Sequence, residues 1–509
     1  MTPFSLEIFR HLLTGVAEEM GAALMRAAFS PNIKERLDFS CALFDDGGRL
    51  LAQASHIPVH LGSMPALLRW VLDHCDLAPG DVWLANDPFR GGTHLPDVTA
   101  ISPFYRGGRL VALAANRAHH SDIGGSTPGS MPLSVDIFQE GLILPPVPLF
   151  RRGRRQQAVW DLLLANVRTP QEREGDLEAQ AAANRIAHRR LAETFDRYGE
   201  AWVAQHQEAI LEYSDRLTRA ALARLPEGTW RFEDELEAAD GGAIPIRVAV
   251  TLGQGEAVCD FTGTAPLGHH CLNAPRSVTE AAVYYVFRCL TGDHVPPNDG
   301  CFRPIRVVIP PGCLLAAESP FGVAGGNVET SQRVVDVVLG ALAQAMPECI
   351  PAASAGTMNN LSFGGDAPLP FTYYETMGGG CGASAEGPGR SAVQTHMTNT
   401  RNTPVEALEM AFPVRVRRYA VRRGSGGAGR YRGGDGLVRE LEFTSPARVT
   451  VLSDRRQAGP WGLQGGSPGA PGRNLLNGQP VPGKTTLDVQ PGDVLTVETP
   501  GGGGFGISN

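Results

Sequence analysis

The chain has 509 residues, of which 42% are hydrophobic and 19% are charged, and its formal net charge is -8. This composition is typical of a soluble protein long enough for about three domains. The negative charge argues against general binding to nucleic acids or to anionic membranes. We therefore interpret the two basic clusters, Arg151–Arg155 and Arg415–Arg423, as solvated surface or as contacts with a partner protein.

The cysteines and the first residues indicate where the protein resides. The nine cysteines form no Cys-x-x-Cys pair, which argues against a disulfide framework and against a structural zinc site. This usage favours a reducing compartment, and we expect a cytoplasmic protein. Residues 1–10 do not resemble a signal peptide, and no apolar run approaches the roughly 18 residues of a membrane span.

The hydrophobic pattern predicts an α+β fold with large mixed sheets and helices, a long central helical segment and a small all-β C-terminal lobe. In the first part of the chain, apolar residues at a spacing of three to four predict a helix over 3–28. A hairpin is expected at 41–52 and a helix at 64–75. Strands are expected at 81–85, 98–101, 110–115 and 142–146.

The second part begins with helical periodicity over 157–225, broken at Arg168–Pro170 and at Tyr198–Gly199. Further helices are expected at 278–290, after the glycine-rich turn 322–327, and at 405–410. Strands are expected at 230–236, 244–252, 257–261, 305–309, 437–443, 449–452 and 494–497. For the glycine-rich end, Thr499–Gly506, we favour fraying over insertion near a site.

The densest polar stretch is Asn86–Asp97, which lies between two predicted strands. His94 and Asp97 are three positions apart, so one turn of the chain can direct both side chains to one point. The segment 117–125 carries three more candidates, His119, His120 and Asp122. Imidazoles and carboxylates together suit a divalent transition metal that polarises a carbonyl or activates water.

From the residues alone, two interpretations of this set remain open. One is a metal site made of Glu35, His94, Asp97 and His119 or His120; the other is a set of hydrogen-bonded loop residues. His120 adjoins His119 and must point differently, which favours a contact behind the ligands or with substrate.

Three other stretches carry candidate chemistry. Residues 478–485 match the phosphate-loop pattern, but Pro480 and Pro482 remove backbone donors, so we predict a loop between short strands. Cys381, among glycines, is either a packed small residue or a nucleophile activated by a base such as His396. The segment 395–406 is equally consistent with a polar cap for the following helix and with substrate recognition, for which the candidates are His396, Asn399 and Arg401.

The segments NDPFRGGTHLPDVT, RAHHSDIGG, NVRTP, GDLEAQ, THMTNTRNTPVE and PGDVLTVETPGGGGFG occur in this order along the chain. Together they resemble the hydantoinase B / 5-oxoprolinase family over essentially the whole length. The resemblance implies a B-type subunit of ATP-dependent enzymes that open cyclic amides such as 5-oxoproline or N-methylhydantoin. The same family includes metal-bearing subunits of acetone and acetophenone carboxylases.

The resemblance also implies a partner. An A-type subunit with an actin-like fold binds ATP and phosphorylates the lactam or enolate oxygen, and the B-type subunit completes the reaction in a hetero-oligomer. The implied ligands of zinc, manganese or iron are Glu35, His94, Asp97 and His119, with Asp38 as the alternative to Glu35. Water activated by the metal is then expected to attack the phosphorylated lactam, with His120 or Asp122 as proton shuttle.

Two other functions remain open at this point. One is a carboxylase subunit in which the metal directs an enolate onto carbon dioxide, and the other is a non-catalytic scaffold for the A-type subunit. Soft boundaries divide the chain into a candidate metal-site α/β region (1–156), a helical segment (157–225), a mixed α/β region with glycine-rich polar loops (226–424) and a small β lobe (425–509).

Overall fold

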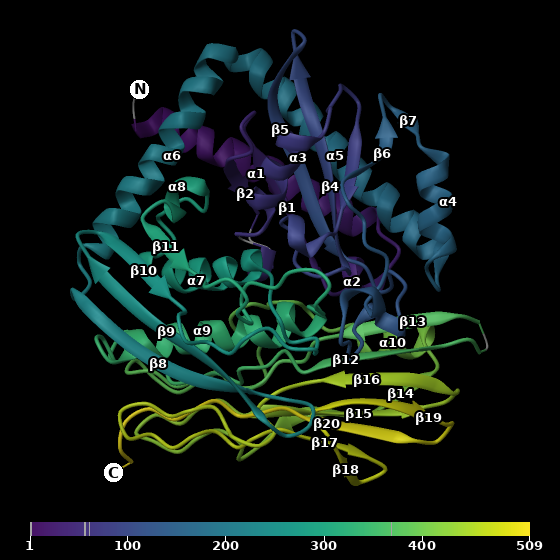
Figure 1. Cartoon of the computed structure of the whole chain (residues 1–509), viewed down its shortest axis with the longest axis vertical. Coiled ribbons are helices and arrows are strands. Elements are labelled where there is room, and N and C mark those ends of the chain that lie inside the picture. The colour runs from purple at the N-terminus through teal and green to yellow at the C-terminus, as the bar shows by residue number, and fades with distance from the viewer. Residues whose placement is uncertain (1–2, 55–56, 61, 368, 509) are drawn as a thin grey trace.

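The computed structural model describes residues 3–54, 57–60, 62–367 and 369–508, and it confirms the predicted α+β fold. The N-terminal part is built on an antiparallel sheet of order β2-β1-β5-β4-β3-β6-β7 (Figure 1). Its strands are β1 (Phe39–Phe44), β2 (Leu50–Gln53), β3 (Val82–Ala85), β4 (Asp97–Arg106), β5 (Arg109–His119), β6 (Val147–Arg151) and β7 (Arg154–Arg155). The pairing of β4 with β5 places Asp97 directly opposite His119.

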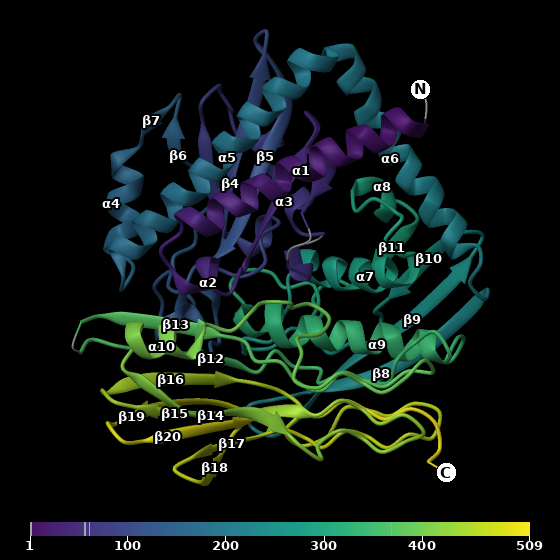
Figure 2. The same ribbon diagram turned by 180° about the vertical axis from the view of Figure 1, so that it is seen from behind.

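Helices cover one face of this sheet. α1 (Pro3–Ala27) packs against β1, β2 and the long α5 (Pro170–Tyr198), and Figure 2 shows both helices crossing that face. The apolar positions that predicted α1 are buried, including Phe9, Leu13 and Met20. The helical segment breaks as predicted, after α4 (Gln157–Ala165) and between α5 and α6 (Glu200–Leu222), because Pro170 begins α5 and Gly199 separates the other two.

Short helical elements complete this part: α2 (Pro31–Lys34), α3 (Met64–His74), η1 (Pro58–His60), η2 (Pro88–Arg90), η3 (Pro128–Ser130) and η4 (Ile137–Gln139). Residues 142–146, all of them described, do not form the strand that we expected there. The side chain of Asn86 instead donates to the carbonyl of Leu142 at 3.0 Å and accepts from the N–H of Leu144 at 2.7 Å. A side chain therefore satisfies backbone groups that a strand would have paired.

A second layer lies beside the first sheet. Its four strands are β8 (Gly228–Glu237), β9 (Ala243–Gly253), β10 (Glu256–Asp260) and β11 (Ile305–Val308). α9 (Ser331–Ala343) packs on β8 and β9, α7 (Arg276–Thr291) packs on α9, and α8 (Asp299–Phe302) contacts α6. A π-helical turn, η5 (Gly326–Thr330), leads directly into α9. In the described part of the chain, every helix is too short or too polar to span a bilayer.

The C-terminal lobe contains two sheets around one apolar core. Their strands are β12 (Asn360–Gly365), β13 (Phe371–Glu375), β14 (Val414–Arg422), β15 (Gly436–Phe443), β16 (Ala447–Leu452), β17 (Arg473–Leu476), β18 (Gln479–Val481), β19 (Lys484–Val489) and β20 (Val494–Glu498), and α10 (Val405–Ala411) contacts β14. β12 pairs with β16, and β14 pairs with β15. We therefore propose that this lobe begins before residue 425.

Glycine-rich segments continue the lobe as extended chains bonded through their backbones, near the C-terminus in Figure 1. The N–H of Gly434 donates to the carbonyl of Cys381, and the N–H of Gly502 donates to the carbonyl of Gly434, each at 2.9 Å. Residues 501–505 are buried, so the prediction that this end frays is wrong. The absence of side chains lets the backbones approach closely enough to bond, a tertiary effect that composition does not reveal.

We predict that Gly502→Ala destabilises the protein by about 2 kcal/mol or more, because an added Cβ would overlap the carbonyl of Cys381. The matched control is Gly387→Ala, where no atom lies within 4 Å of the added Cβ and the change should cost less than about 0.5 kcal/mol. Chemical unfolding of both variants measures the difference. Equal stabilities would contradict the close packing of these segments.

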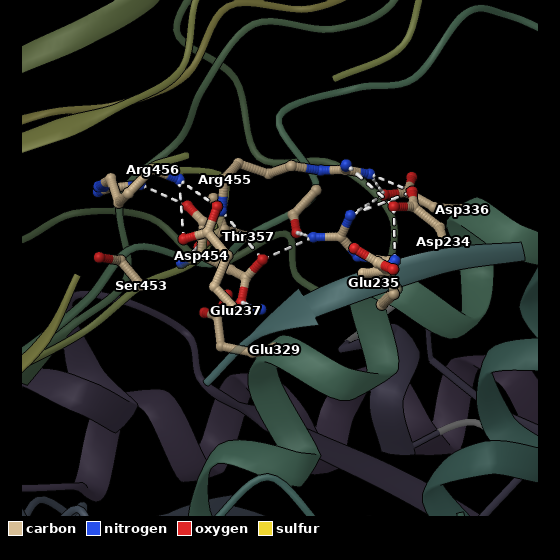
Figure 3. A network of polar contacts seen from close by, with 12 residues as sticks. Asp234, Glu235, Glu237, Glu329, Asp336, Thr357, Ser453, Asp454, Arg455 and Arg456 are labelled. Atoms are coloured by element: carbon tan, nitrogen blue, oxygen red, sulfur yellow. Dashed lines mark hydrogen bonds and ion pairs between the residues drawn. The ribbon is translucent and has the colours of Figure 1, made fainter. Parts of the chain in front are cut away.

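A buried ion cluster ties the second layer to the lobe. Its members are Asp234, Arg333, Asp336, Asp454, Arg455 and Lys484. Arg333 on α9 lies 2.8 Å from Asp454 and 3.1 Å from Asp234. In Figure 3 the side chain of Arg455 points toward Asp234 and Asp336. Its Nη2 lies 2.6 Å from Asp234 and 2.9 Å from Asp336. Charges this deeply buried are tolerated because each faces an opposite charge.

Removing one member should leave an uncompensated charge in this interior. We predict that Asp454→Ala lowers the free energy of unfolding by about 3–5 kcal/mol. The control Asp488→Ala removes a carboxylate that pairs with the exposed Arg448 at 2.8 Å and should leave stability nearly unchanged. Chemical unfolding tests both, and an Asp454→Ala protein as stable as the control would show that the cluster is not structural.

Candidate metal centre

Three buried side chains, His94, Asp97 and His119, converge at one end of the β4–β5 hairpin. One ligand atom from each lies within 4.8 Å of the others. His94 belongs to the loop before β4, Asp97 begins β4, and His119 ends β5. The predicted pair on one turn and the predicted histidine on the second segment are thus brought together by strand register.

The loop that presents His94 is shaped by its acid and its glycines. Asp87 accepts a hydrogen bond from the N–H of Phe89 at 3.0 Å and so forms the turn rather than a ligand. Gly91 has a φ of 93°, and a Cβ on Gly92 would lie only 2.6 Å from the carbonyl oxygen of Asp87. Glycine is therefore required at both positions for the loop to fold back on itself.

The histidine nitrogens have the character of ligands. Nδ1 and Nε2 of His94 and Nε2 of His119 are buried and have no hydrogen-bond partner in the described part of the chain. A buried polar atom without a partner costs about 1–3 kcal/mol. Convergent orphaned nitrogens beside a carboxylate are the donor set that a divalent transition metal takes, so these residues fit such an ion.

The protonation states also fit. Burial alone would raise the pKa of Asp97, but the imidazoles of His94 and His60 lower that pKa well below its usual value. Burial and the neighbouring His94 lower the pKa of His119 well below its usual value. An ionised carboxylate and a neutral imidazole are the forms that bind metal.

The structure places Asp38, rather than Glu35, at the cavity beside this group. Asp38 lines the same cavity as Asp97 and His119, and its carbonyl accepts from the N–H of His119 at 3.0 Å. Glu35 caps α2, is only partly buried, and does not line this cavity. The reason is local: the chain turns at Leu37, with a φ of 57°, and enters β1 immediately after Asp38.

The two predicted proton shuttles have other partners. His120 is the first residue after β5 and faces α5, where its Nε2 lies 3.0 Å from Oε1 of Gln180. Burial, then the charge of Arg173, lower the pKa of His120 to about 4. Asp122 accepts from Nη1 of Arg168 at 2.7 Å. Neither side chain lines the cavity beside the convergent group.

The predicted substrate segment borders this cavity through neighbours of the residues we named. The cavity has a volume of about 20 Å³, and Met397, Thr398 and Thr400 form part of its wall. Asn399 and Arg401 are exposed, and His396 is buried with its Nε2 3.7 Å from Oδ1 of Asp336.

Sequence reasoning missed residues that hold Asp97 in place. Nε2 of His60 lies 3.3 Å from Oδ2 of Asp97, and Thr93 donates to the same oxygen at 2.6 Å. Asn327, in η5, approaches it at 3.5 Å. The glycine-rich turn before Asn327 was the only signal in the sequence for this contact, because the residues are 230 positions apart.

The other stretches do not form sites of their own. We predicted a loop between short strands at 478–485; the structure has β18 and the start of β19 there, joined by a short connection. Nζ of Lys484 donates to Asp454 at 2.8 Å. Cys381 is half-buried, and Oγ of Ser354 lies 3.7 Å from its Sγ.

The similarity to known proteins extends along essentially the whole chain. The family model described as Hydantoinase B/oxoprolinase matches residues 2–508. 5-Oxoprolinase 1 of Arabidopsis thaliana is 42% identical over 98% of this chain, but the chain spans only 41% of that relative. The B subunit of a putative D-/L-hydantoinase from Pseudomonas sp. (strain NS671) is 32% identical over 99% of this chain, which covers 90% of it.

Two solved structures share the fold. The ATP-dependent caprolactamase from Pseudomonas jessenii superposes with a TM-score of 0.93 at 29% identity, covering 100% of this chain and 91% of that one. The nucleotide-free acetone carboxylase has a TM-score of 0.90 at 19% identity, covering 99% of this chain and 76% of that one. The second likeness is one of fold.

We predict that the purified chain binds one divalent transition metal and that His94→Ala and Asp97→Ala abolish this binding, measured by elemental analysis after dialysis. Asp38→Ala should weaken binding, whereas Glu35→Ala should not, because only Asp38 lines the cavity. His120→Ala is the matched control. Weaker binding in Glu35→Ala together with unchanged binding in Asp38→Ala would reverse our choice of the fourth ligand.

Proposed function

Because this chain belongs to the hydantoinase B/oxoprolinase family, we propose that it is the B-type subunit of an ATP-dependent cyclic amide hydrolase and that it completes ring opening at a metal centre. The observation that carries the proposal is the convergence of three buried side chains, His94, Asp97 and His119, in which imidazole nitrogens of both histidines have no hydrogen-bond partner in the described part of the chain. A scaffold without a ligand has no use for such an arrangement, since it destabilises the fold.

Neighbouring side chains fix the orientation of one proposed ligand, Asp97. His94, Asp97, His119 and Asp38 would hold the ion, and Thr93 and His60 fix the carboxylate of Asp97 through Oδ2. When bound, a divalent metal supplies a Lewis acid that polarises a carbonyl or activates water. Outer contacts of this kind set the direction of the ligands.

The small volume of the cavity limits which part of a substrate can enter it. Its volume of about 20 Å³ holds roughly one water-sized group. We infer that only the reacting carbonyl region of a lactam, and not the whole ring, reaches the ligands. Thr398 and Thr400 line the cavity while Asn399 and Arg401 between and beside them are exposed, so the substrate would approach across this segment.

The names and lengths of the relatives support a partner subunit. The chain spans 41% of a 5-oxoprolinase but 90% of a protein named as one part of a hydantoinase. We propose that an A-type partner binds ATP and activates the amide oxygen. All nine cysteines are free, which supports our proposal of a cytoplasmic protein.

We predict that the chain, reconstituted with an A-type subunit, hydrolyses ATP in a lactam-dependent manner without bicarbonate. The panel is 5-oxoproline, a hydantoin and caprolactam, and the assay follows ring opening together with phosphate release. His94→Ala should lower turnover by more than about 100-fold, since losing even an outer partner of a metal ligand costs 10–100-fold.

Two outcomes would replace this proposal. Strict dependence on bicarbonate, with incorporation of carbon dioxide, would establish a carboxylase subunit, the function of the enzyme in the second solved structure. Unchanged turnover in both His94→Ala and Asp97→Ala would leave only the scaffold.

A further inference from the structure

Tyr374, on β13, connects the candidate metal centre with a part of the molecule that the proposed function does not use. Its ring stacks on the imidazole of His119 with a centroid separation of 4.4 Å and an interplanar angle of 9°. The guanidinium carbon of Arg36 lies 5.1 Å from the centroid of the same ring. Tyr374 also lines the cavity, so the ring is both a wall of the site and a support for one ligand.

The hydroxyl of Tyr374 is hydrogen-bonded to a buried side chain. It donates to Oδ1 of Asn360 at 2.7 Å, and Nδ2 of Asn360 donates to Oε1 of Glu329 at 2.7 Å. All three side chains are almost completely inaccessible to solvent. Two bonds in series therefore fix the tilt of the ring that lies against His119.

Glu329 occupies an unusual position for a carboxyl group. It belongs to the π-helical turn η5, which also carries Asn327, the residue that approaches Asp97. Its Oε1 accepts from Asn360 and from the N–H of Met358 at 3.1 Å, while Oε2 has no partner in the described ranges of the chain. Such turns are frequent at functional sites.

The charges around Glu329 favour its neutral form. Burial, then the nearby carboxylate of Asp454, raise the pKa of Glu329 to about 7. In Figure 3, Glu329 lies beside the ion cluster rather than within it. A carboxyl group that neither pairs with a base nor reaches solvent adds little to stability. We therefore interpret the role of Glu329 as fixing the side chain of Asn360.

We propose that Glu329 and Asn360 are positioning residues, which act through the ring of Tyr374 to fix the orientation of His119 in the metal centre. Nδ1 of His119 already lies 3.0 Å from Nδ2 of Asn32, so that contact fixes one edge of the imidazole and the stacked ring fixes its plane. Together they determine where Nε2 points. The inference rests on the proposed metal centre.

The experiment uses Co²⁺ as the probe, added to the metal-free full-length chain, and records its affinity and its visible absorption bands. The contacts from Glu329 through Asn360 and Tyr374 to His119 are called the relay below. Tyr374→Phe removes the anchoring hydroxyl but keeps the stacked ring, and Glu329→Ala removes the far end of the relay. Each should weaken Co²⁺ binding about 10-fold and shift the bands. Because both changes break one chain of contacts, the double variant should be no weaker than the weaker single variant.

Two controls separate this role from general stability. Glu329→Gln keeps the acceptor for Asn360 and should restore the bands and affinity of the unmodified chain. Tyr373→Phe removes the neighbouring buried hydroxyl, which is hydrogen-bonded to Glu375 at 3.1 Å and to Thr403 at 3.0 Å, away from the centre. It should lose comparable stability while leaving the Co²⁺ spectrum unchanged.

The outcomes distinguish the inference from the proposal beneath it. If the unmodified chain binds Co²⁺, His94→Ala does not, and Tyr374→Phe and Glu329→Ala match the unmodified spectrum, the relay is wrong and the metal centre stands. If the unmodified chain and His94→Ala bind Co²⁺ equally, the relay and the metal centre are both wrong. Should Tyr374→Phe be insoluble, Asn360→Ala takes its place, and unchanged bands there and in Glu329→Ala overturn the relay.

Discussion

The register of one hairpin determines the site. β4 and β5 pair so that Asp97 lies opposite His119, at the end of the hairpin where the loop bearing His94 returns to the sheet. A shift of one residue would turn one of these side chains to the other face. His120, the residue after His119, faces α5 and bonds Gln180 instead.

The rest of the molecule closes this end of the hairpin from three directions. Asp38 arrives from the start of β1, Asn327 from the π-helical turn before α9, and Tyr374 from the C-terminal lobe. Each comes from a different layer, so the relative placement of the layers decides the geometry of the centre. The buried ion cluster and the packed glycine-rich chains hold that placement, at the cost of strict sequence requirements.

The sequence revealed the parts of the site that depend on local spacing. Two short loops between strands predicted the pair His94 and Asp97 with either His119 or His120, and the structure brings His119 to the pair. Glu35 was preferred to Asp38 both from the residues and from the resemblance. Only the structure shows that Asp38, which follows the turn at Leu37, lines the cavity.

What could not be predicted depends on contacts between distant segments. Nothing in the spacing of Tyr374 or Asn360 marks them, because their neighbours are hundreds of positions away or on another strand. The predictions of a strand at 142–146 and of a frayed terminus were wrong for the same reason. The side chain of Asn86 bonds the backbone of the first segment, and other glycine-rich backbones bond the second. Local propensity contains no information about such distant partners.

The most direct test of this account is a crystal structure of the chain soaked with zinc or manganese, with the ion located by anomalous scattering. The account predicts one ion bonded to His94, Asp97 and His119 at about 2.0–2.2 Å, with a carboxylate oxygen of Asp38 in the same shell. An ion bound elsewhere while these side chains stay uncoordinated, or one that takes Glu35 in place of Asp38, would contradict it.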